Sequence, residues 1–534
     1  MNVQFSLLED ALIRFRNSQR QERRVTLPEL LVAFNHDGVC DFPALRPHQR
    51  HPWHAFLVQL AAIALHAAGR KSPFETADDW RAALLALSPD DREGAAFSLV
   101  APDDRPAFLQ APCEREASRA WKKIIATPDA LDMLVTSRNH DLKAERMVHA
   151  QAEDWIYALV SLQTQEGFLG AGNYGISRMN GGFASRPGFG VVPAGRWGKR
   201  WARDVQLLLR DRKGISKRNG LKETGGVALV WLQPWDGNSS LSFNELDPFY
   251  IEVCRRVRLQ VRGETLSAIA TGSKVVRIAA KERCGMTGDA WTPINLAEGK
   301  ALSITSRGFD YKLTNELAFR SGAYEASIAR EILEEDGKEG LFILAQGIAR
   351  GKGKTEGYHE RRIPIRKTMR GLMLRQQTDK IAEAADRRIE AIGYVRKTLW
   401  SAVCALLGNG DQNVSDDTKS KASGFARVFE QGEDRRFFDD LADEIEADDG
   451  DAEHDQWLRA LVDRAAAVLE QAFVMGPRSA ERVYRARGAA LSRFHGGVRA
   501  EKAHHRIARV LKERDEARKA ARHESFEEAV DGSS

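Results

Sequence analysis

The chain has 534 residues, 43% of them hydrophobic and 29% charged, and a formal net charge of +5, so it is long enough for about two to four domains with substantial cores. No run of 18 uninterrupted apolar residues occurs and the N-terminus lacks the charged-then-apolar order of a secretion signal, so neither a membrane span nor membrane partners are expected. The five cysteines are scattered without a CxxC pair, which favours a reducing, cytoplasmic location and argues against a disulfide framework or a cysteine zinc site.

The first part of the chain mixes short strands, helices and loops. Residues 1–34 predict a strand or hairpin with charged edges, and 53–68 (WHAFLVQLAAIALHAA) predict an apolar helix. Three histidines, at 48, 51 and 54, lie close together just before or at the start of this helix. A metal site is conceivable from this spacing, but no nearby carboxylate or cysteine completes it. A polar turn is the favoured interpretation.

A glycine-rich segment follows at residues 167–200. It contains ten glycines and two prolines, which excludes a regular helix or a central strand. The segment therefore predicts an ordered loop or a series of turns. Glycine there would let the backbone approach a partner closely.

A basic stretch overlaps the end of this segment. Residues 196–222 hold ten lysines and arginines against two acids, and two tryptophans lie among the first of them. Interleaved basic and aromatic residues are typical of nucleic-acid contacts, although a structural loop followed by a solvated helix face is the alternative. The predicted basic patch consists of Lys199, Arg200 and Arg203.

The sequence then becomes rich in strand patterns. Residues 249–320 alternate apolar and polar side chains, and GLFILAQ (340–346) and RRIPIRK (361–367) predict two strands of a hairpin with a basic tip. The segment from Gly347 to Thr355 resembles a Walker A loop, but it has one residue too many and no apolar helix follows it. A hairpin tip that contacts nucleic acid is therefore favoured over nucleotide hydrolysis.

After about residue 367 the pattern changes to long helices without strand signals. The sequence predicts an α+β fold, with a large mixed N-terminal domain (1–368) that includes a β-rich part and a C-terminal four-helix bundle (369–534).

Candidate catalytic groups are few. The segment SRNHDLK (137–143) combines Asn, His and Asp, but the further ligands of a nuclease do not follow at suitable spacing. A polar loop that holds a ligand or an RNA phosphate is favoured, and a plain surface loop remains possible. No Ser/His/Asp order or paired-carboxylate motif stands out, so we predict a protein that is not an enzyme.

Several pieces, taken in order, resemble the CasA family, the large subunit of the type I-E CRISPR surveillance complex called Cascade. The resembling pieces are FSLLEDALIRFR (5–16), VTLPELLVAF (25–34), RPAFLQAP (105–112), TSRNHDLK (136–143), NGGFASRPGFGVVP (180–193) and VWLQPWDG with ELDPF (230–249). No single piece is diagnostic, but six in the right order followed by a helical C-terminus are hard to obtain by chance.

The resemblance implies recognition of the protospacer-adjacent motif (PAM) on double-stranded DNA, and opening of that duplex for R-loop formation. Family members read the motif largely from the minor groove, whose degenerate code tolerates several motifs. The implied partners are other Cascade subunits, CRISPR RNA, double-stranded target DNA and a recruited helicase-nuclease. No cofactor is implied.

The resemblance also implies site residues. The glycine loop would be Asn180, Gly181 and Gly182, and the guide-RNA handle loop Asn139, His140 and Lys143. Lys281 would be the lysine finger, because it precedes Trp291-Thr-Pro at nearly the family spacing, with Lys274 as second choice. The wedge hairpin would consist of Gly351, Lys352, Gly353, Lys354 and Thr355.

Two departures from the family stand out. Only Cys254 remains where some members carry a cysteine-rich zinc element, so no metal is expected. Lys352, Lys354 and Thr355 stand where some members carry a wedge glutamine, so strand opening would depend more on charge. The alternatives are a P-loop-like nucleotide-dependent enzyme and a purely structural scaffold subunit.

Overall fold

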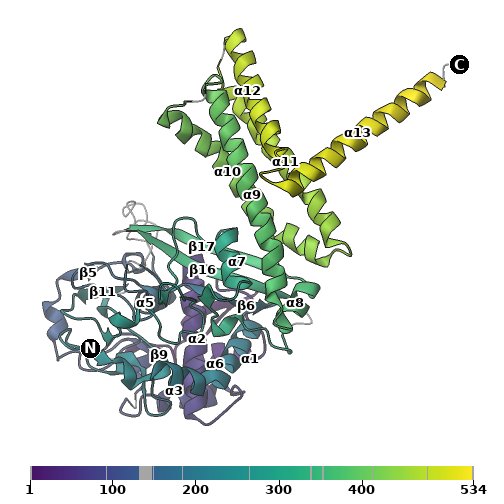
Figure 1. Cartoon of the computed structure of the whole chain (residues 1–534). Coiled ribbons are helices and arrows are strands. Elements are labelled where there is room, and N and C mark those ends of the chain that lie inside the picture. Colours follow the sequence, from purple (N-terminus) through teal and green to yellow (C-terminus); the bar gives the residue numbers. More distant parts are fainter. Residues whose placement is uncertain are drawn as a thin grey trace. The chain divides into compact units, whose positions relative to one another are not determined.

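The computed structural model of the chain describes residues 3–91, 93–131, 147, 149–182, 184–263, 265–336, 340–351, 354–411, 413–477 and 479–531 (Figure 1). It divides into two compact units. The N-terminal unit comprises Met1–Phe309 and Gly322–Ile365, and the helical unit comprises Asp310–Ser321 and Arg366–Ser534. The short segment 310–321 therefore packs with the helices, whereas the sequence-based division assigned it to the N-terminal part.

The N-terminal unit combines helices with several small sheets. Its helices are α1 (Leu27–Asn35), α2 (Arg50–Ala67), α3 (Ala77–Ala86), α5 (Ala152–Gln165) and α6 (Trp197–Asn219). Its strands are β1 (Gln4–Ser6), β2 (Ile13–Arg16), β3 (Glu22–Val25), β4 (Ser98–Val100), β5 (Lys123–Ile125), β6 (Gly188–Pro193), β7 (Val227–Leu229), β8 (Leu241–Ser242), β9 (Leu246–Ile251), β10 (Arg256–Arg262), β11 (Thr265–Thr271), β12 (Ile278–Ala279), β13 (Ile294–Asn295), β14 (Lys300–Ala301), β15 (Tyr324–Glu325), β16 (Leu341–Gly351) and β17 (Lys354–Ile365).

The described strands pair in seven small sheets rather than one large sheet. Three sheets have three strands, in the orders β10-β11-β5, β14-β13-β15 and β17-β16-β6. The remaining pairs are β1-β4 and β2-β3, which are antiparallel, and β7-β9 and β12-β8, which are parallel. Most of these strands are short and leave long connecting segments, on which the predicted glycine loop and Lys274 lie.

Helix α2 is the centre of the N-terminal core. It is largely apolar and buried along nearly its whole length, as expected for a helix surrounded by other elements. It packs against α5, α6 and β9. The indole nitrogen of Trp201 on α6 donates to the carbonyl of Leu57 at 3.3 Å, which fixes α6 against α2.

The glycine-rich segment contains a strand that the sequence did not predict. Residues Gly188–Pro193 form β6, an edge strand that runs antiparallel to β16 from Gln346↔Gly188 to Leu341↔Pro193. Two of its glycines are needed for close packing. A Cβ atom at Gly188 would lie 2.5 Å from Nδ1 of His51, and one at Gly190 would lie 2.8 Å from Cβ of Ala329. The local glycine content masked a strand that long-range packing creates.

Strands β16 and β17 form the predicted hairpin, longer than the sequence suggested. Their register runs from Leu341↔Ile365 to Gly351↔Lys354. A phosphate-binding loop needs a helix N-terminus after the glycine–lysine turn, whereas here β17 follows and continues to Ile365. The P-loop alternative is therefore wrong, because the lysine that resembles the Walker lysine begins a returning strand.

The three early histidines are buried, not part of a polar turn. His48 lies in a short 3-10 helix and His51 and His54 in α2, each no more than 2% exposed. Nε2 of His54 lies 2.8 Å from Oδ2 of Asp204 on α6, and the Trp291 indole donates to the same carboxylate at 3.1 Å. The interpretation as a polar turn missed this burial, because the carboxylate partner of His54 comes from a distant part of the chain. Among the residues that the structure describes, no group of three metal-binding side chains forms.

This buried pair predicts acid sensitivity of the N-terminal unit. Burial, helped by the charge of Arg200, lowers the pKa of His54 to about 4, so folding requires the neutral imidazole. A depressed folded-state pKa gives stability that is fully present above the unfolded value near pH 6.5 and is lost as the pH falls towards 4. The free energy of unfolding should drop by roughly 3 kcal/mol across this window. His51 should also make the free energy of unfolding fall with falling pH, since burial lowers its pKa as well.

Urea unfolding of the free chain at several pH values between 7 and 4 measures this effect. In the variant His54→Gln, which cannot titrate, the slope between pH 6.5 and 4 should be smaller. An unfolding free energy that is constant from pH 7 to 4.5 would contradict the assignment.

The helical unit is built around one long helix. Its helices are α7 (Tyr311–Ala318), α8 (Lys367–Leu374), α9 (Thr378–Leu407), α10 (Asp416–Glu446), α11 (Gly450–Ala472), α12 (Ala480–Val498) and α13 (His505–Asp531). Helix α9 contacts α7, α8, α10, α11 and α12, and α13 packs against α11. A buried carboxylate, Glu444, joins α9 to α10 and α11 through Arg388 at 2.6 Å and His454 at 3.0 Å.

The two units together confirm the predicted α+β fold class, with a mixed N-terminal part and a C-terminal helical bundle. None of the described helices is both long enough and apolar enough to cross a membrane.

Candidate nucleic-acid interface

Residues Asn180, Gly181 and Gly182 form an exposed turn of the N-terminal unit, called here the glycine turn. Gly181 has a φ of +83°, a conformation that side-chain-bearing residues rarely adopt. The amide of Gly182 donates to Oδ1 of Asn180 at 3.1 Å, which closes the turn. Both glycines are exposed, so the turn presents bare backbone to a partner.

Buried arginines hold both sides of the glycine turn. Before it, Nη1 of Arg178 contacts Oε1 of Glu252 at 2.8 Å, and its guanidinium lies 3.8 Å from the centroid of the Tyr250 ring. After it, Arg186 forms a two-pronged pair with Asp289, at 2.8 and 2.6 Å. Two-pronged arginine–carboxylate pairs fix geometry as well as charge. The glycine turn is therefore exposed at its tip and rigidly fixed at its base.

Asp289 is the group that the two arginines share. Its Oδ1 also lies 3.8 Å from Nε of Arg178, and the Thr292 hydroxyl donates to Oδ2 at 2.6 Å. Burial alone would raise the pKa of Asp289, but the charge and hydrogen bonds of Arg186 and the charge of Arg178 hold it well below its usual range. The carboxylate therefore stays ionised at neutral pH and keeps its pair with Arg186.

Lys281 lies beside the glycine turn. It opens a short 3-10 helix (Lys281–Arg283) and its side chain is exposed. A Cβ atom built on Gly181 would lie 4.0 Å from the carbonyl oxygen of Lys281. Gly285 follows with φ +84°, and a Cβ there would lie 2.8 Å from the carbonyl oxygen of Met179. The structure thus brings together the predicted glycine loop and the predicted lysine finger, which are far apart in the sequence.

A hollow of about 470 Å³ adjoins these residues, called here the turn hollow. It is lined by Gly181 and Lys281 and also by Lys274, the second-choice lysine. Lys274 is exposed, and its carbonyl accepts a hydrogen bond from the Tyr174 hydroxyl at 3.0 Å. Both candidate lysines therefore belong to the same surface.

The hairpin is connected to the glycine turn through the end of α5. Arg350 on β16 pairs with Glu166 at 2.7 Å, and both side chains are 1% exposed. The neighbouring Gln165 donates to the carbonyl of Arg186 at 3.1 Å. Two adjacent residues of the chain thus hold the end of β16 and the base of the glycine turn.

Parts of the predicted site lie outside the described residues. Asn139, His140 and Lys143 of the handle loop are among these, as are Lys352 and Gly353 of the wedge and the side chain of Lys354. Gly351 ends β16, and Thr355 is a buried residue of β17.

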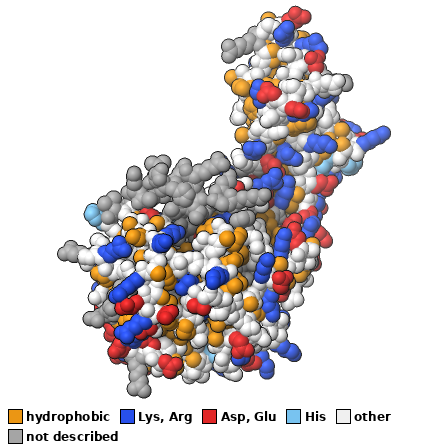
Figure 2. Space-filling view, turned by 90° about the vertical axis from the view of Figure 1, so that its left-hand side faces the viewer, with side chains coloured by type: hydrophobic (Ala, Val, Ile, Leu, Met, Phe, Trp, Pro, Cys, Tyr) orange, Lys and Arg blue, Asp and Glu red, His pale blue; other side chains and the backbone are white. Residues whose placement is uncertain are grey.

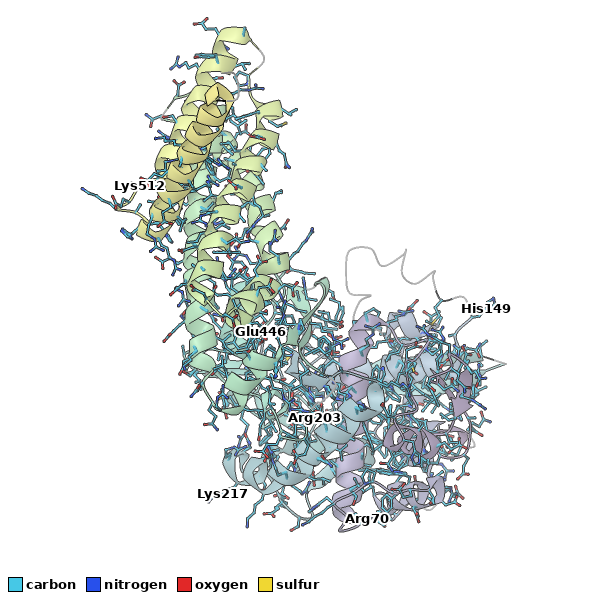
Figure 3. The ribbon with its side chains drawn as sticks, turned by 90° about the vertical axis from the view of Figure 1, so that its right-hand side faces the viewer. Arg70, His149, Arg203, Lys217, Glu446 and Lys512 are labelled. Atoms are coloured by element: carbon cyan, nitrogen blue, oxygen red, sulfur yellow. The ribbon has the colours of Figure 1, made fainter. Side chains whose placement is uncertain are left out.

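The predicted basic patch does not form as expected. Nε of Arg203 contacts both carboxylate oxygens of Asp336, at 2.8 and 2.9 Å, and Arg203 is 5% exposed. Figure 3 places Arg203 within the body of the N-terminal unit and Lys217, on the same helix, at its periphery. Arg203 therefore cannot contact phosphate, because its buried guanidinium is already paired. Lys199 and Arg200 are half-buried.

Basic side chains do not gather into one large patch on the face of the N-terminal unit that Figure 2 shows. On the face shown in Figure 2, lysine and arginine side chains of the N-terminal unit lie as separate groups among acids and apolar side chains. The dense run of basic residues in the sequence is divided by α6 into buried and exposed positions, as happens on any amphipathic helix.

Arg203→Ala should therefore lower the stability of the chain and leave the salt dependence of DNA binding unchanged. It leaves Asp336 buried without its partner, which should lower the free energy of unfolding by about 3–5 kcal/mol. Lys217→Ala, at an exposed position of the same helix, should change stability by less than about 0.5 kcal/mol. Urea unfolding of both variants gives the comparison. A stable Arg203→Ala chain with a reduced salt slope of DNA binding would restore the basic-patch prediction.

Sequence reasoning missed the residues that fix the glycine turn: Arg178, Arg186, Glu252 and Asp289. One signal was present. Arg178 and Arg186 are the only charged residues between Gly167 and Gly195, and isolated charges in such a segment usually have dedicated partners. Their carboxylate partners could not be identified from spacing alone.

The fold and this surface define a class: an α+β unit with an exposed glycine turn beside a lysine, joined in one chain to a helical bundle. Solved structures with this fold include CasA (Cse1) structures. That of Thermus thermophilus CasA (Cse1) matches at 16% identity with a TM-score of 0.62, covering 92% of this chain and 99% of that one. Cse1 of Acidimicrobium ferrooxidans matches at 15% identity with a TM-score of 0.61, covering 95% of this chain and 98% of that one. Cse1 of Thermobifida fusca matches at 14% identity with a TM-score of 0.60, covering 94% of this chain and 98% of that one.

No family model and no curated protein matches the sequence. At this level of identity the comparison establishes the fold, over nearly the full length of both chains. The resemblance to CasA seen in the sequence is thereby confirmed at the level of the fold.

Proposed function

We propose that this chain is a CasA-type large subunit of an RNA-guided complex of the type I-E Cascade class, and that it reads the short motif flanking the target in double-stranded DNA. The observation that carries this proposal is the rigidly held glycine turn with Lys281 beside it. The CasA fold supports the same assignment.

The geometry suits reading from the minor groove. A bare glycine backbone can approach the floor of a narrow groove where side chains would collide. Lysine side chains donate hydrogen bonds to the acceptors on A·T and G·C pairs there, so several motifs are tolerated. Rigid arginine pairs at the base reduce the ordering that binding would otherwise require.

The β16–β17 hairpin is the proposed wedge. Two paired strands of 11 and 12 residues form a stiff element, and the Arg350–Glu166 pair ties it to the segment that holds the glycine turn. Unstacking a base step costs a few kcal/mol, which new protein contacts and guide pairing offset. Coupling the wedge to the reading surface would restrict opening to duplexes with a suitable flank.

The remaining roles follow from the resemblance. We propose that the chain acts in the cytoplasm with the other subunits and CRISPR RNA, contacts the guide handle through residues 139–143, and recruits a helicase-nuclease that performs cleavage. The chain itself would contribute no catalytic group and no cofactor.

Lysine substitutions test which side chain reads the flank. In the guide-loaded complex, Lys281→Ala should reduce the discrimination between flanks and lower the slope of log affinity against log salt by about one. Lys274→Ala should change the salt slope without changing discrimination, since the backbone of Lys281, and not that of Lys274, lies within 4 Å of a Cβ atom built on Gly181. Lys217→Ala is the control for removing an exposed lysine elsewhere. Loss of discrimination in Lys274→Ala alone would exchange the two roles.

The scaffold alternative gives a different result in the same experiment. A purely structural subunit would leave duplex affinity and its salt slope unchanged in all three lysine variants.

A further inference from the structure

The turn hollow has one aromatic wall. Phe168 and Tyr174 lie with ring centroids 6.0 Å apart and planes tilted by 34°. Several of the other lining side chains are apolar, among them Ile176, Met179 and Val276. The volume of about 470 Å³ falls within the range of roughly 300–1,000 Å³ that is typical of small-ligand sites.

The two segments that line the hollow are fixed to each other. The amide of Ser273 donates to the carbonyl of Gly172 at 3.0 Å, and the Tyr174 hydroxyl donates to the carbonyl of Lys274 at 3.0 Å. One backbone bond and one side-chain bond therefore fix the two segments in position relative to each other.

The charge of the lining favours a nucleic acid. Lys274 and Lys281 line the hollow and are exposed, whereas no acidic side chain is among its described lining residues. An apolar, aromatic interior with lysines at its exposed positions matches a flat base flanked by phosphates. Stacking on aromatic rings tolerates any base, because every base has a π-face.

We propose that the turn hollow receives one unstacked nucleobase from the DNA flanking the target, stacked on Tyr174, with an adjacent phosphate beside Lys274, while Lys281 contacts the motif itself. This inference rests on the proposed function and adds a base-binding site to it. Gly181 lines the same hollow, so the base would leave the duplex where the glycine turn contacts it. Holding the base out of the stack would keep the opened duplex from closing.

Abasic substitutions locate such a base. The guide-loaded complex with the full chain is tested on duplexes that each lack one base, at successive positions of the flank and of the displaced strand. One position should show a loss of affinity of about fivefold to a hundredfold, since that is the contribution of a single stacked base. In Tyr174→Ala the intact duplex should bind more weakly by the same factor, and removal of that base should have no further effect.

Further variants control for loss of the ring. Tyr174→Phe keeps the ring and should keep the position-specific loss. Val276→Trp, which fills the hollow, should remove it as Tyr174→Ala does. Tyr484→Ala removes a tyrosine that is 85% exposed on α12 and should leave the profile unchanged.

The outcomes separate this inference from the proposed function. If Gly181→Asp abolishes flank discrimination while Tyr174→Ala and Val276→Trp leave the abasic profile unchanged, the reading role stands and the base site is wrong. If no position shows a specific loss, the base site is also wrong. If Tyr174→Ala instead releases another subunit from the complex, the hollow is a protein-docking site and the inference is overturned.

Discussion

Gly181→Asp is expected to abolish the ability of the guide-loaded complex to distinguish duplexes by their flanks. The residue has φ +83°, so any side chain there strains the turn. A carboxylate at this point would also face the phosphates of a bound duplex. Together these effects should reduce affinity for a duplex with a preferred flank by at least about tenfold, whereas guide pairing to single-stranded target should be retained.

Gly322→Asp is the matched control for this variant. Gly322 is also in the N-terminal unit, exposed and at φ +84°, with no atom within 4 Å of the position of a new Cβ. It carries the same backbone strain and the same added charge away from the glycine turn. Equal losses of discrimination in the two variants would show that strain or net charge, and not the glycine turn, is responsible.

Asp289→Ala is expected to have a large effect on stability, as large as that of Arg203→Ala. It removes the carboxylate that Arg186 holds with two contacts and that Arg178 approaches, and it leaves a buried guanidinium without its partner. Breaking such a pair should lower the free energy of unfolding by about 3–5 kcal/mol. The glycine turn should lose its fixed base at the same time, so flank discrimination should fall in whatever complex still assembles.

Urea unfolding of the free chain measures the first effect, with Glu298→Ala as control. Glu298 also pairs with a cation, Lys300, but both side chains are exposed, so its loss should cost no more than about 1 kcal/mol. A cost for Asp289→Ala as small as that of Glu298→Ala would mean that the buried pairs do not support the turn.

Features set by local sequence were predictable. The apolar helix that became α2, the β16–β17 hairpin and the change to long helices near residue 367 each depend on periodicity within a short window. The rejection of the Walker A loop is also confirmed, because the residues after the turn form a returning strand, as their sequence indicated.

Features set by distant partners were not predictable. The strand β6 exists because β16 pairs with it, although its glycines and proline suggest a loop when read alone. His54 was interpreted as part of a polar turn and Arg203 as part of a basic patch, but Asp204 and Asp336 provide carboxylate partners for them in the core. The sequence alone does not show whether a polar side chain is hydrogen-bonded to water or to a buried group.

The candidate site falls between these cases. The glycine turn and Lys281 were proposed through resemblance, and the structure places them side by side. Their support, from Arg178, Glu252, Arg186 and Asp289, depends on pairs between segments far apart in the chain. The turn hollow arises in the same way, from two segments that only the fold brings together.

The most direct test of the central claim compares guide-loaded complexes with and without this chain. Each is bound to duplexes that differ only in the base pairs flanking the target, and to the single-stranded target alone. The account predicts that the complete complex distinguishes the flanks and that the complex without the chain does not, while both bind the single strand equally. Unchanged discrimination without the chain would contradict it.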